Sequence, residues 1–274
     1  MSNIPPAFKA ACVQVNASND MDENIRVAVD YVRQAAGQGA ELVFLPENVA
    51  MMTFGDGNIR ANARTMDDHP AIPAFSALAK ELGVWLHGGT LAIDLGDKIA
   101  NRAFVYSPNG DVVATYDKIH MFDVDLEGGE SYRESATFSP GTDKVLIDTP
   151  WGGLGLSTCY DVRFPYLYRA LANAGATMLS VPAAFTVPTG TAHWHVLLRA
   201  RAIENGCFVF APAQVGTHFN DRKTFGHSLI IDPWGEVLAD AGDEPGVVVA
   251  DIDPVRVVEA RKMVPSLTHT RDIS

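Results

Sequence analysis

The sequence has few cysteines, no run of basic residues, no long apolar segment and no leader-like start. Its three cysteines, Cys12, Cys159 and Cys207, are far apart and form no C-x-x-C pair, which argues against a disulfide framework or a zinc site. Asp and Glu outnumber Lys and Arg by 33 to 21, so we expect no nucleic acid partner. No uncharged apolar stretch reaches the roughly 18 residues of a membrane span, and the start does not resemble a signal peptide. We therefore expect a cytoplasmic protein that does not enter a membrane.

The composition is that of an ordinary globular protein. Of the 274 residues, 47% are hydrophobic and 20% are charged, which excludes a disordered or collagen-like chain. No linker, low-complexity tract or compositional break divides the sequence. We therefore expect one domain over residues 1–274, with its core at about residues 8–255 and a C-terminal helix and tail at residues 256–274.

Apolar residues recur with helical and strand spacing along the chain and predict an α/β fold. Helices are predicted at residues 20–37, 71–82, 165–174, 192–205 and 255–263. Strands are predicted at residues 8–15, 41–47, 84–93, 177–182, 207–213 and 247–252, with hairpins at 101–118, 144–160 and 229–240. The simplest arrangement is two mixed sheets with helices outside both.

Cys159 lies where an apolar strand, LGLSTC, gives way to YDVRFP and a helix. A thiol at such a corner faces a helix N-terminus, and with Arg163 nearby we expect its pKa to fall below the usual value of about 8.5. The alternative is a thiol that only packs in the core, which is the interpretation for Cys12 and Cys207.

A thiol nucleophile needs a base, and eight histidines are available. Neither of the local cysteine signatures of papain-like and caspase-like enzymes surrounds Cys159. His193 and His195 are two residues apart on a predicted helix and therefore do not share a face, so they are poor joint metal ligands. His120 and His227 stay open as candidates, although a hydrogen-bonded supporting role is the commoner one. No metal ligand set is predicted.

Two further reactive side chains lie at strand ends. Glu47 closes the apolar strand LVFLPE, where an ionised carboxylate is unfavourable unless it has a partner, and Lys118 closes VVATYDK. Each also has a simpler interpretation. Glu47 would lie in the first turn of a helix, and Lys118 would be solvated at the end of a strand. Together with Cys159, they predict one constellation of a carboxylate, an ammonium group and a thiol.

Five segments carry a resemblance to a known family. LPENVA, YDKIHMFDVD and STCYDVRFP resemble the three signature segments of the nitrilase superfamily of carbon-nitrogen hydrolases, and the similarity extends from about residue 9 to residue 271. TAHWHVLLRARAIENGCFVFAPAQVG and RKTFGHSLIIDPWGEVLA resemble the Nit-type branch of amidases. Within that branch, the segment from Arg222 to Ser228 looks more like the deaminated glutathione amidases than the ω-amidases.

The resemblance implies a four-layer α-β-β-α sandwich that pairs into a homodimer or a higher homo-oligomer. It implies that Glu47 is the general base, Lys118 the group that stabilises the oxyanion, and Cys159 the nucleophile. The substrate would be a small-molecule amide, hydrolysed through a thioester on the cysteine. No cofactor and no metal are implied.

Glu134, in the segment YRES, falls where the branch has a second catalytic glutamate that supports the lysine and orients the substrate. Glu127 and Glu130 precede it, so the register of this loop stays open at the level of sequence.

The substrates of the branch carry a carboxylate, which an arginine binds through two parallel hydrogen bonds. Arg163 and Arg222 are the candidates for this contact, and Arg163 alternatively forms an ion pair with Asp161 or Glu134. Tyr160, Phe185 and Trp194 are expected to line the pocket, although core packing is the commoner role for aromatic residues at such positions.

Several functions remain open from sequence. The first is hydrolysis of deaminated glutathione to 2-oxoglutarate and Cys-Gly. Others are an ω-amidase acting on 2-oxoglutaramate, a nitrilase or an N-carbamoyl amidase. A catalytically silent binding or scaffold protein is the alternative outside enzymes.

Overall fold

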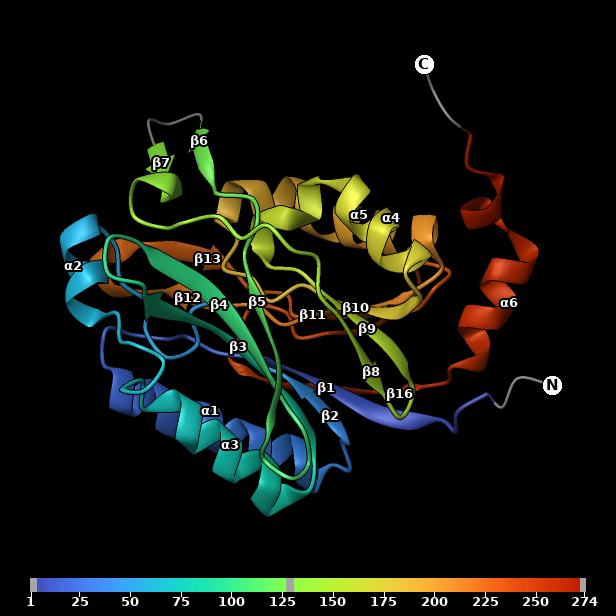
Figure 1. Cartoon of the computed structure of the whole chain (residues 1–274), viewed down its shortest axis with the longest axis horizontal. Helices are drawn as coiled ribbons and strands as arrows, with labels where there is room; N and C mark the ends of the chain where they lie inside the picture. Colours follow the sequence, from blue (N-terminus) through green and yellow to red (C-terminus); the bar gives the residue numbers. More distant parts are fainter. Residues whose placement is uncertain (1–3, 127–130, 272–274) are drawn as a thin grey trace.

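The computed structural model describes residues 4–126 and 131–271. Two six-stranded sheets face each other, and helices cover the outer face of each sheet (Figure 1). The layers therefore follow in the order α-β-β-α. This confirms the mixed α/β fold and the four-layer sandwich that the resemblance implied.

The two sheets are built alike. The first has the strand order β16-β1-β2-β3-β4-β5 and the second β15-β14-β11-β10-β9-β8. Three central strands are parallel in each sheet, and antiparallel strands flank them on both sides. The strands of the first sheet are β1 Phe8–Gln14, β2 Leu42–Phe44, β3 Trp85–Asp94, β4 Ile99–Tyr106, β5 Val112–Asp117 and β16 Gly246–Ile252. Those of the second sheet are β8 Leu146–Thr149, β9 Gly152–Leu156, β10 Ala176–Ser180, β11 Phe208–Ala211, β14 Leu229–Ile231 and β15 Val237–Asp240.

Apolar side chains fill the three spaces between the four layers. α1 Met21–Gly37 and α3 Ala71–Leu82 cover the first sheet, and α4 Pro165–Asn173 and α5 Val187–Asn205 cover the second. Between the sheets, the rings of Phe44 and Phe210 stack with centroids 4.6 Å apart. Burial of apolar area at about 25 cal/mol per Å² supplies the main driving force for this arrangement.

The predicted bounds are correct for α3 and for α6 Val255–Met263. The predicted start of α5 at residue 192 is wrong, because the helix begins at Val187. Residues 188–191 are Pro, Thr and Gly, which are weak helix formers, so the sequence does not indicate a helix there. The structure accommodates Pro188 because proline is tolerated in the first turn of a helix. Sequence reasoning also missed four short strands and a short helix, which are β6 Asp123–Asp125, β7 Ser131–Arg133, β12 Val215–Thr217, β13 Lys223–Phe225 and α2 Asp56–Asn62.

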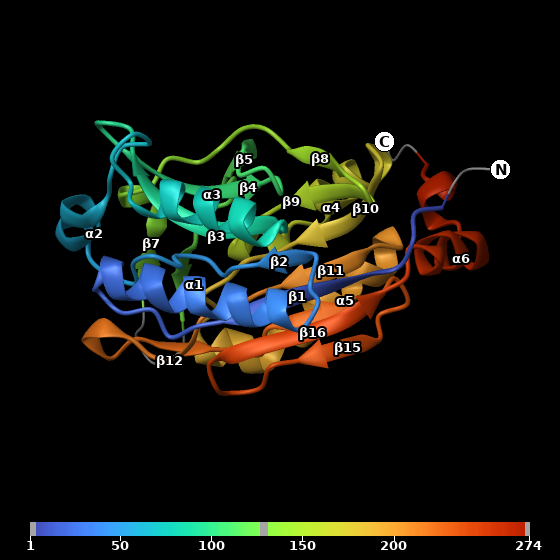
Figure 2. The same cartoon turned by 90° about the horizontal axis from the view of Figure 1, so that it is seen from below.

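The missed elements gather at one end of the sandwich. In Figures 1 and 2, α2 and the β12–β13 hairpin lie at the end opposite to α6. Within residues 4–126 and 131–271, no helix combines the length and the apolar character needed to cross a membrane.

Candidate active site

Glu47, Lys118 and Cys159 follow strands β2, β5 and β9 and lie at the same end of the sandwich as α2. All three line one cavity of about 890 Å³. The cavity thus brings together the carboxylate, the ammonium group and the thiol, as the sequence predicted.

The turn that carries Glu47 is fixed by the bulged strand β3. Gly89 has φ +66°, and a Cβ atom there would lie 2.1 Å from the carbonyl oxygen of Pro46, so glycine is required. The next residue, Thr90, accepts a hydrogen bond from the backbone N–H of Asn48 at 3.0 Å. These contacts hold the backbone on both sides of Glu47.

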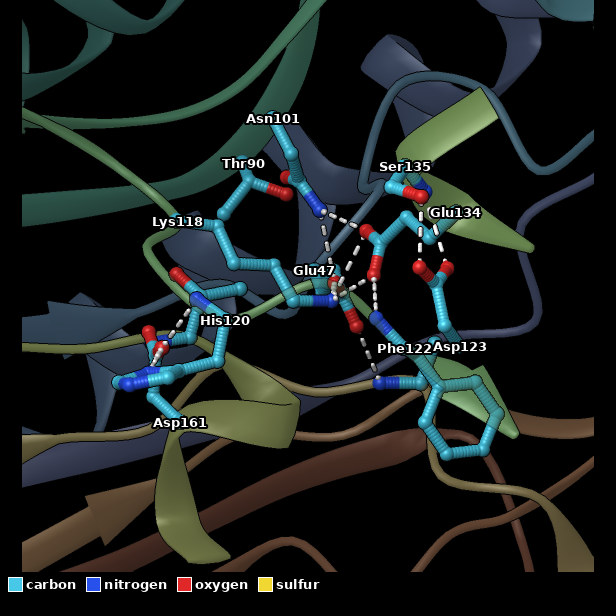
Figure 3. A network of polar contacts seen from close by, with 12 residues as sticks. Glu47, Thr90, Asn101, Lys118, His120, Phe122, Asp123, Glu134, Ser135 and Asp161 are labelled. Carbon is cyan, nitrogen blue, oxygen red and sulfur yellow. Dashed lines mark hydrogen bonds and ion pairs between the residues drawn. The ribbon is translucent and has the colours of Figure 1, made fainter. Parts of the chain in front are cut away.

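The Glu47 carboxylate is 3% exposed and is hydrogen-bonded at both oxygens. Oε1 accepts from Asn101 Nδ2 at 2.8 Å and from Lys118 Nζ at 3.1 Å (Figure 3). Oε2 accepts from the backbone N–H of Ala184 at 2.9 Å. A buried carboxylate is unfavourable without such partners. The side chain is therefore held in one orientation within the cavity.

Lys118 is 2% exposed and lies between two glutamates. Its Nζ lies 3.1 Å from Glu47 Oε1 and 2.9 Å from both carboxylate oxygens of Glu134 (Figure 3). Burial by itself lowers the pKa of the Lys118 ammonium, but the negative charges of Glu134 and Glu47 outweigh it and hold that pKa well above its ordinary value. The amine therefore stays protonated.

Glu134 is positioned by the loop around it. Its Oε2 accepts a hydrogen bond from the backbone N–H of Phe122 at 2.6 Å, while Asp123 accepts from the backbone N–H and the hydroxyl of Ser135 (Figure 3). The glutamate is thereby aimed at the lysine, where the resemblance placed it. The two other glutamates considered for this loop, Glu127 and Glu130, lie outside the described residues.

Cys159 begins the short 3-10 helix Cys159–Arg163 after β9 and has φ +49°, a left-handed conformation that is strained for a residue with a side chain. Its backbone N–H donates to the Pro182 carbonyl at 2.9 Å. The N–H of Tyr160 comes next, in the first turn, where backbone donors have no partner within the helix. Both Cys159 and Tyr160 line the cavity.

Asp161 joins the cysteine turn to the lysine loop. Its buried carboxylate accepts from Thr158 N at 2.8 Å, Tyr116 Oη at 2.6 Å and His120 N at 3.0 Å, and it contacts His120 Nδ1 at 2.6 Å. Figure 3 shows the contact between His120 and Asp161. Sequence reasoning missed this connecting role, although Asp161 follows Cys159 by two residues.

The expectation of a lowered thiol pKa is wrong. Burial raises the pKa of Cys159 well above its ordinary value, the Glu47 carboxylate raises it further, and Lys118 opposes the shift. Arg163, which was expected to lower it, directs its guanidinium to His193 Nδ1 at 3.3 Å. The thiol is therefore protonated at neutral pH, and a nucleophile of this kind depends on a base beside it.

The structure separates the predicted substrate-binding residues. Tyr160, Phe185 and Arg222 line the cavity, whereas Arg163 and Trp194 do not, and Trp194 is buried in the core instead. Arg163 lies over the rings of Tyr160 and Phe185, with its guanidinium carbon 5.7 and 5.5 Å from their centroids. The two carboxylates that the sequence offers as partners of Arg163 have other contacts. Glu134 binds Lys118, and Asp161 accepts hydrogen bonds from the cysteine turn and the lysine loop.

The guanidinium group of Arg222 lies between two aromatic rings. Its guanidinium carbon lies 4.1 Å from the ring centroid of Phe54 and 4.8 Å from that of Tyr132. The Nε atom is buried and has no hydrogen-bond partner among residues 4–126 and 131–271, and Nη2 donates a long 3.5 Å bond to the Ala184 carbonyl. Burial lowers the pKa of Arg222 from its ordinary value. This arrangement orients a guanidinium and leaves it able to bind an anion in the cavity.

Comparison with known proteins assigns the family. The sequence profile described as carbon-nitrogen hydrolase matches residues 9–262. The chain belongs to the carbon-nitrogen hydrolase family. It is thus an enzyme of the class that hydrolyses carbon-nitrogen bonds other than peptide bonds, as the sequence motifs predicted.

Three relatives place this carbon-nitrogen hydrolase among Nit-type proteins. Deaminated glutathione amidase of Synechocystis sp. is 43% identical over 267 residues, which is 96% of this chain and 97% of that protein. Omega-amidase NIT2 of Homo sapiens is 36% identical over 97% of this chain and 95% of its own length. The crystal structure of Saccharomyces cerevisiae Nit3, a member of branch 10 of the nitrilase superfamily, superposes with a TM-score of 0.87 at 30% identity, covering 96% of this chain and 97% of that one.

The Glu47 carboxylate adds to the effect of burial in raising the pKa of Cys159, and its contribution can be measured by alkylation. Because a nearby negative charge disfavours the thiolate, Glu47→Gln should lower the apparent pKa for iodoacetamide labelling of Cys159. The midpoint would be read from labelling rates against pH, with the modified peptide identified by mass. An unchanged or higher midpoint in Glu47→Gln would contradict the assignment, and the buried Cys12 serves as the unreactive internal control.

Proposed function

We propose that this carbon-nitrogen hydrolase is an amidase in which Cys159 attacks the amide carbonyl and Glu47 is the base. The observation that carries the proposal is the placement of the Cys159 thiol, the buried Glu47 carboxylate and the Lys118 ammonium group around one cavity, with the pKa values of the thiol and of the ammonium group both raised. A protonated thiol needs such a base. A silent binding protein would have no need of a buried carboxylate and ammonium group beside a thiol.

In acylation, a C–S bond replaces the C–N bond of the amide, and the thiol proton passes through Glu47 to the leaving nitrogen. Glu47 takes the thiol proton as sulfur bonds to the carbonyl carbon, and the oxyanion is held by Lys118 Nζ and the backbone N–H of Tyr160. The C–N bond then breaks, and the leaving nitrogen takes the proton from Glu47, which leaves a thioester on Cys159. A positioned base contributes a factor of about 10² to 10⁴, and one oxyanion donor contributes about 10² to 10³.

Deacylation uses the same groups. Glu47, again ionised, takes a proton from water as its oxygen attacks the thioester carbonyl. The tetrahedral intermediate collapses to the carboxylic acid, and the thiolate of Cys159 regains a proton. Glu134 is a positioning residue in both steps, because it holds Lys118 charged and in place.

For the substrate, we propose a small amide that carries a carboxylate bound by Arg222. The buried, aromatic-stacked guanidinium supports this class, because a substrate carboxylate can accept the hydrogen bond of Nε, which has no acceptor among the described residues. The named activities of the relatives supply the candidates: deaminated glutathione first, because of the 43% identity, and a 2-oxo acid ω-amide second. A cavity of about 890 Å³ has room for a peptide-sized leaving group as well as ammonia.

Other expectations from sequence stay predictions. These are a single domain, which the family match over residues 9–262 supports, a homo-oligomeric state and a cytoplasmic location.

Removing each proposed catalytic group should lower turnover without unfolding the chain. Cys159→Ala should show no turnover above background, Glu47→Gln a kcat lower by about 10² to 10⁴, and Lys118→Ala a kcat lower by about 10² to 10³. Release of ammonia or amine from a panel of ω-amides would be measured, and circular dichroism would verify folding. Cys12→Ala is the matched control with unchanged kcat. A folded Cys159→Ala protein with full activity would refute the mechanism.

The two arginines can be distinguished by kinetics. A hydrogen bond to a charged group is worth about 1.5–3 kcal/mol, so Arg222→Met should raise KM for a carboxylate-bearing amide roughly 10- to 150-fold. The change should be much smaller for the methyl ester of the same substrate. Arg163→Met is the matched control and should alter KM less than about threefold on the same scale. Equal effects of Arg222→Met on acid and ester, or a larger effect of Arg163→Met, would overturn the assignment.

A further inference from the structure

Two histidines and an aspartate meet outside the active-site cavity. His195 comes from α5, His227 precedes β14 and Asp240 ends β15. His195 Nε2 lies 3.0 Å from Asp240 Oδ2, and His227 Nδ1 lies 2.9 and 3.1 Å from the two oxygens of Asp240. In the sequence, His195 was considered as a metal ligand only together with His193. The approach of His195 to His227 and Asp240 was therefore not predicted.

We propose that His195 Nε2, His227 Nδ1 and the Asp240 carboxylate form a binding site for a divalent transition-metal ion such as Zn²⁺. One ligand atom from each residue lies within 4.8 Å of the others. In a tetrahedral zinc centre with bonds of about 2.0–2.2 Å, neighbouring ligand atoms are about 3.3 Å apart. The two histidine-aspartate separations are already close to this value, and the imidazoles need to approach each other by at most about 1.5 Å.

The groups around these three side chains are those that support metal ligands. The other ring nitrogen of His227, Nε2, lies 3.1 Å from Asp243 Oδ1, and Asp240 Oδ1 accepts from the backbone N–H of Gly242 at 2.9 Å. A metal-bound histidine ordinarily gives its second N–H to a carboxylate, and a ligating carboxylate is itself hydrogen-bonded. These contacts therefore give His227 and Asp240 the supporting partners that metal ligands ordinarily have.

The ring of His227 is held before any ion binds. It stacks on Phe225 with centroids 4.6 Å apart and an interplanar angle of 25°. Its backbone has φ +55°, and its carbonyl accepts from Trp194 Nε1 at 2.8 Å. Preorganised ligands lose little freedom on binding, so a rigid His227 favours the ion over a loose surface contact.

The donor set and its exposure indicate which ion fits. Imidazole nitrogens suit Zn²⁺, Ni²⁺ and Cu²⁺, whereas Mg²⁺ and Ca²⁺ require oxygen ligands. The side chains of His195, His227 and Asp240 are 36%, 24% and 33% exposed, which leaves a path for the ion and for a water as fourth ligand. The two aspartates and the formal net charge of −12 attract a cation.

Calorimetric titration with ZnCl₂ tests the site. The protein would carry no histidine tag and would contain Cys159→Ala, which removes the thiol as a competing ligand. We expect one Zn²⁺ per chain, at least tenfold weaker binding in His195→Ala and in His227→Ala, and binding 10- to 100-fold weaker in Asp243→Asn. His193→Ala, an exposed histidine on the same helix, is the matched control and should bind as before.

X-ray absorption of the zinc-loaded protein provides a measurement that does not depend on the folding of variants. It should show two imidazoles with oxygen ligands and no sulfur. Absence of stoichiometric binding, or zinc that persists in folded His195→Ala and His227→Ala, would overturn the proposal and leave a hydrogen-bonded cluster. The result is independent of the amidase mechanism, because no catalytic group is among the ligands.

Discussion

The buried ammonium of Lys118 is the constraint on which the site depends. A cation at 2% exposure is tolerable only with partners, and the chain supplies two carboxylates from different segments, Glu47 and Glu134. Those carboxylates are in turn held by Asn101 and by two backbone N–H groups. Removing one member of a buried pair typically costs about 3–5 kcal/mol, because the other charge is left alone. The network therefore fixes the catalytic geometry and the ionisation of its members together.

The two-sheet architecture explains how this network forms. Glu47 and Lys118 follow strands of the first sheet, whereas Cys159 follows a strand of the second, so the cavity spans both sheets at one end. Asp161 fixes the relation between them, since it binds the backbone of the cysteine turn and of the lysine loop at once. The packing of the sheets therefore determines the geometry of the site, and a shift of either sheet would separate the Cys159 thiol from the Glu47 carboxylate.

The sequence predicted well what depends on periodicity and on strand ends. Apolar spacing predicted the layers and most of the elements. The reactive residues at strand ends predicted the convergence of Glu47, Lys118 and Cys159. The short segments α2, β6–β7 and β12–β13 could not be predicted, because polar runs of three to seven residues carry no period.

The effects of charges that lie far apart along the chain could not be predicted from the sequence either. From the sequence, Arg163, a neighbour along the chain, is expected to lower the thiol pKa, but burial and then the charge of Glu47, far from Cys159 in sequence, raise it. The same limit applies to the His195–Asp240 contact, and to the position of Arg222 between two rings contributed by other segments.

Covalent catalysis by Cys159 is tested most directly by trapping the acyl-enzyme. During turnover of a carboxylate-bearing amide, acid-quenched protein should carry the acyl part of the substrate on the peptide that contains Cys159, and hydroxylamine should release it as a hydroxamate. Product formation with Cys159 unmodified and no hydroxamate, or an adduct on another residue, would contradict the thioester pathway.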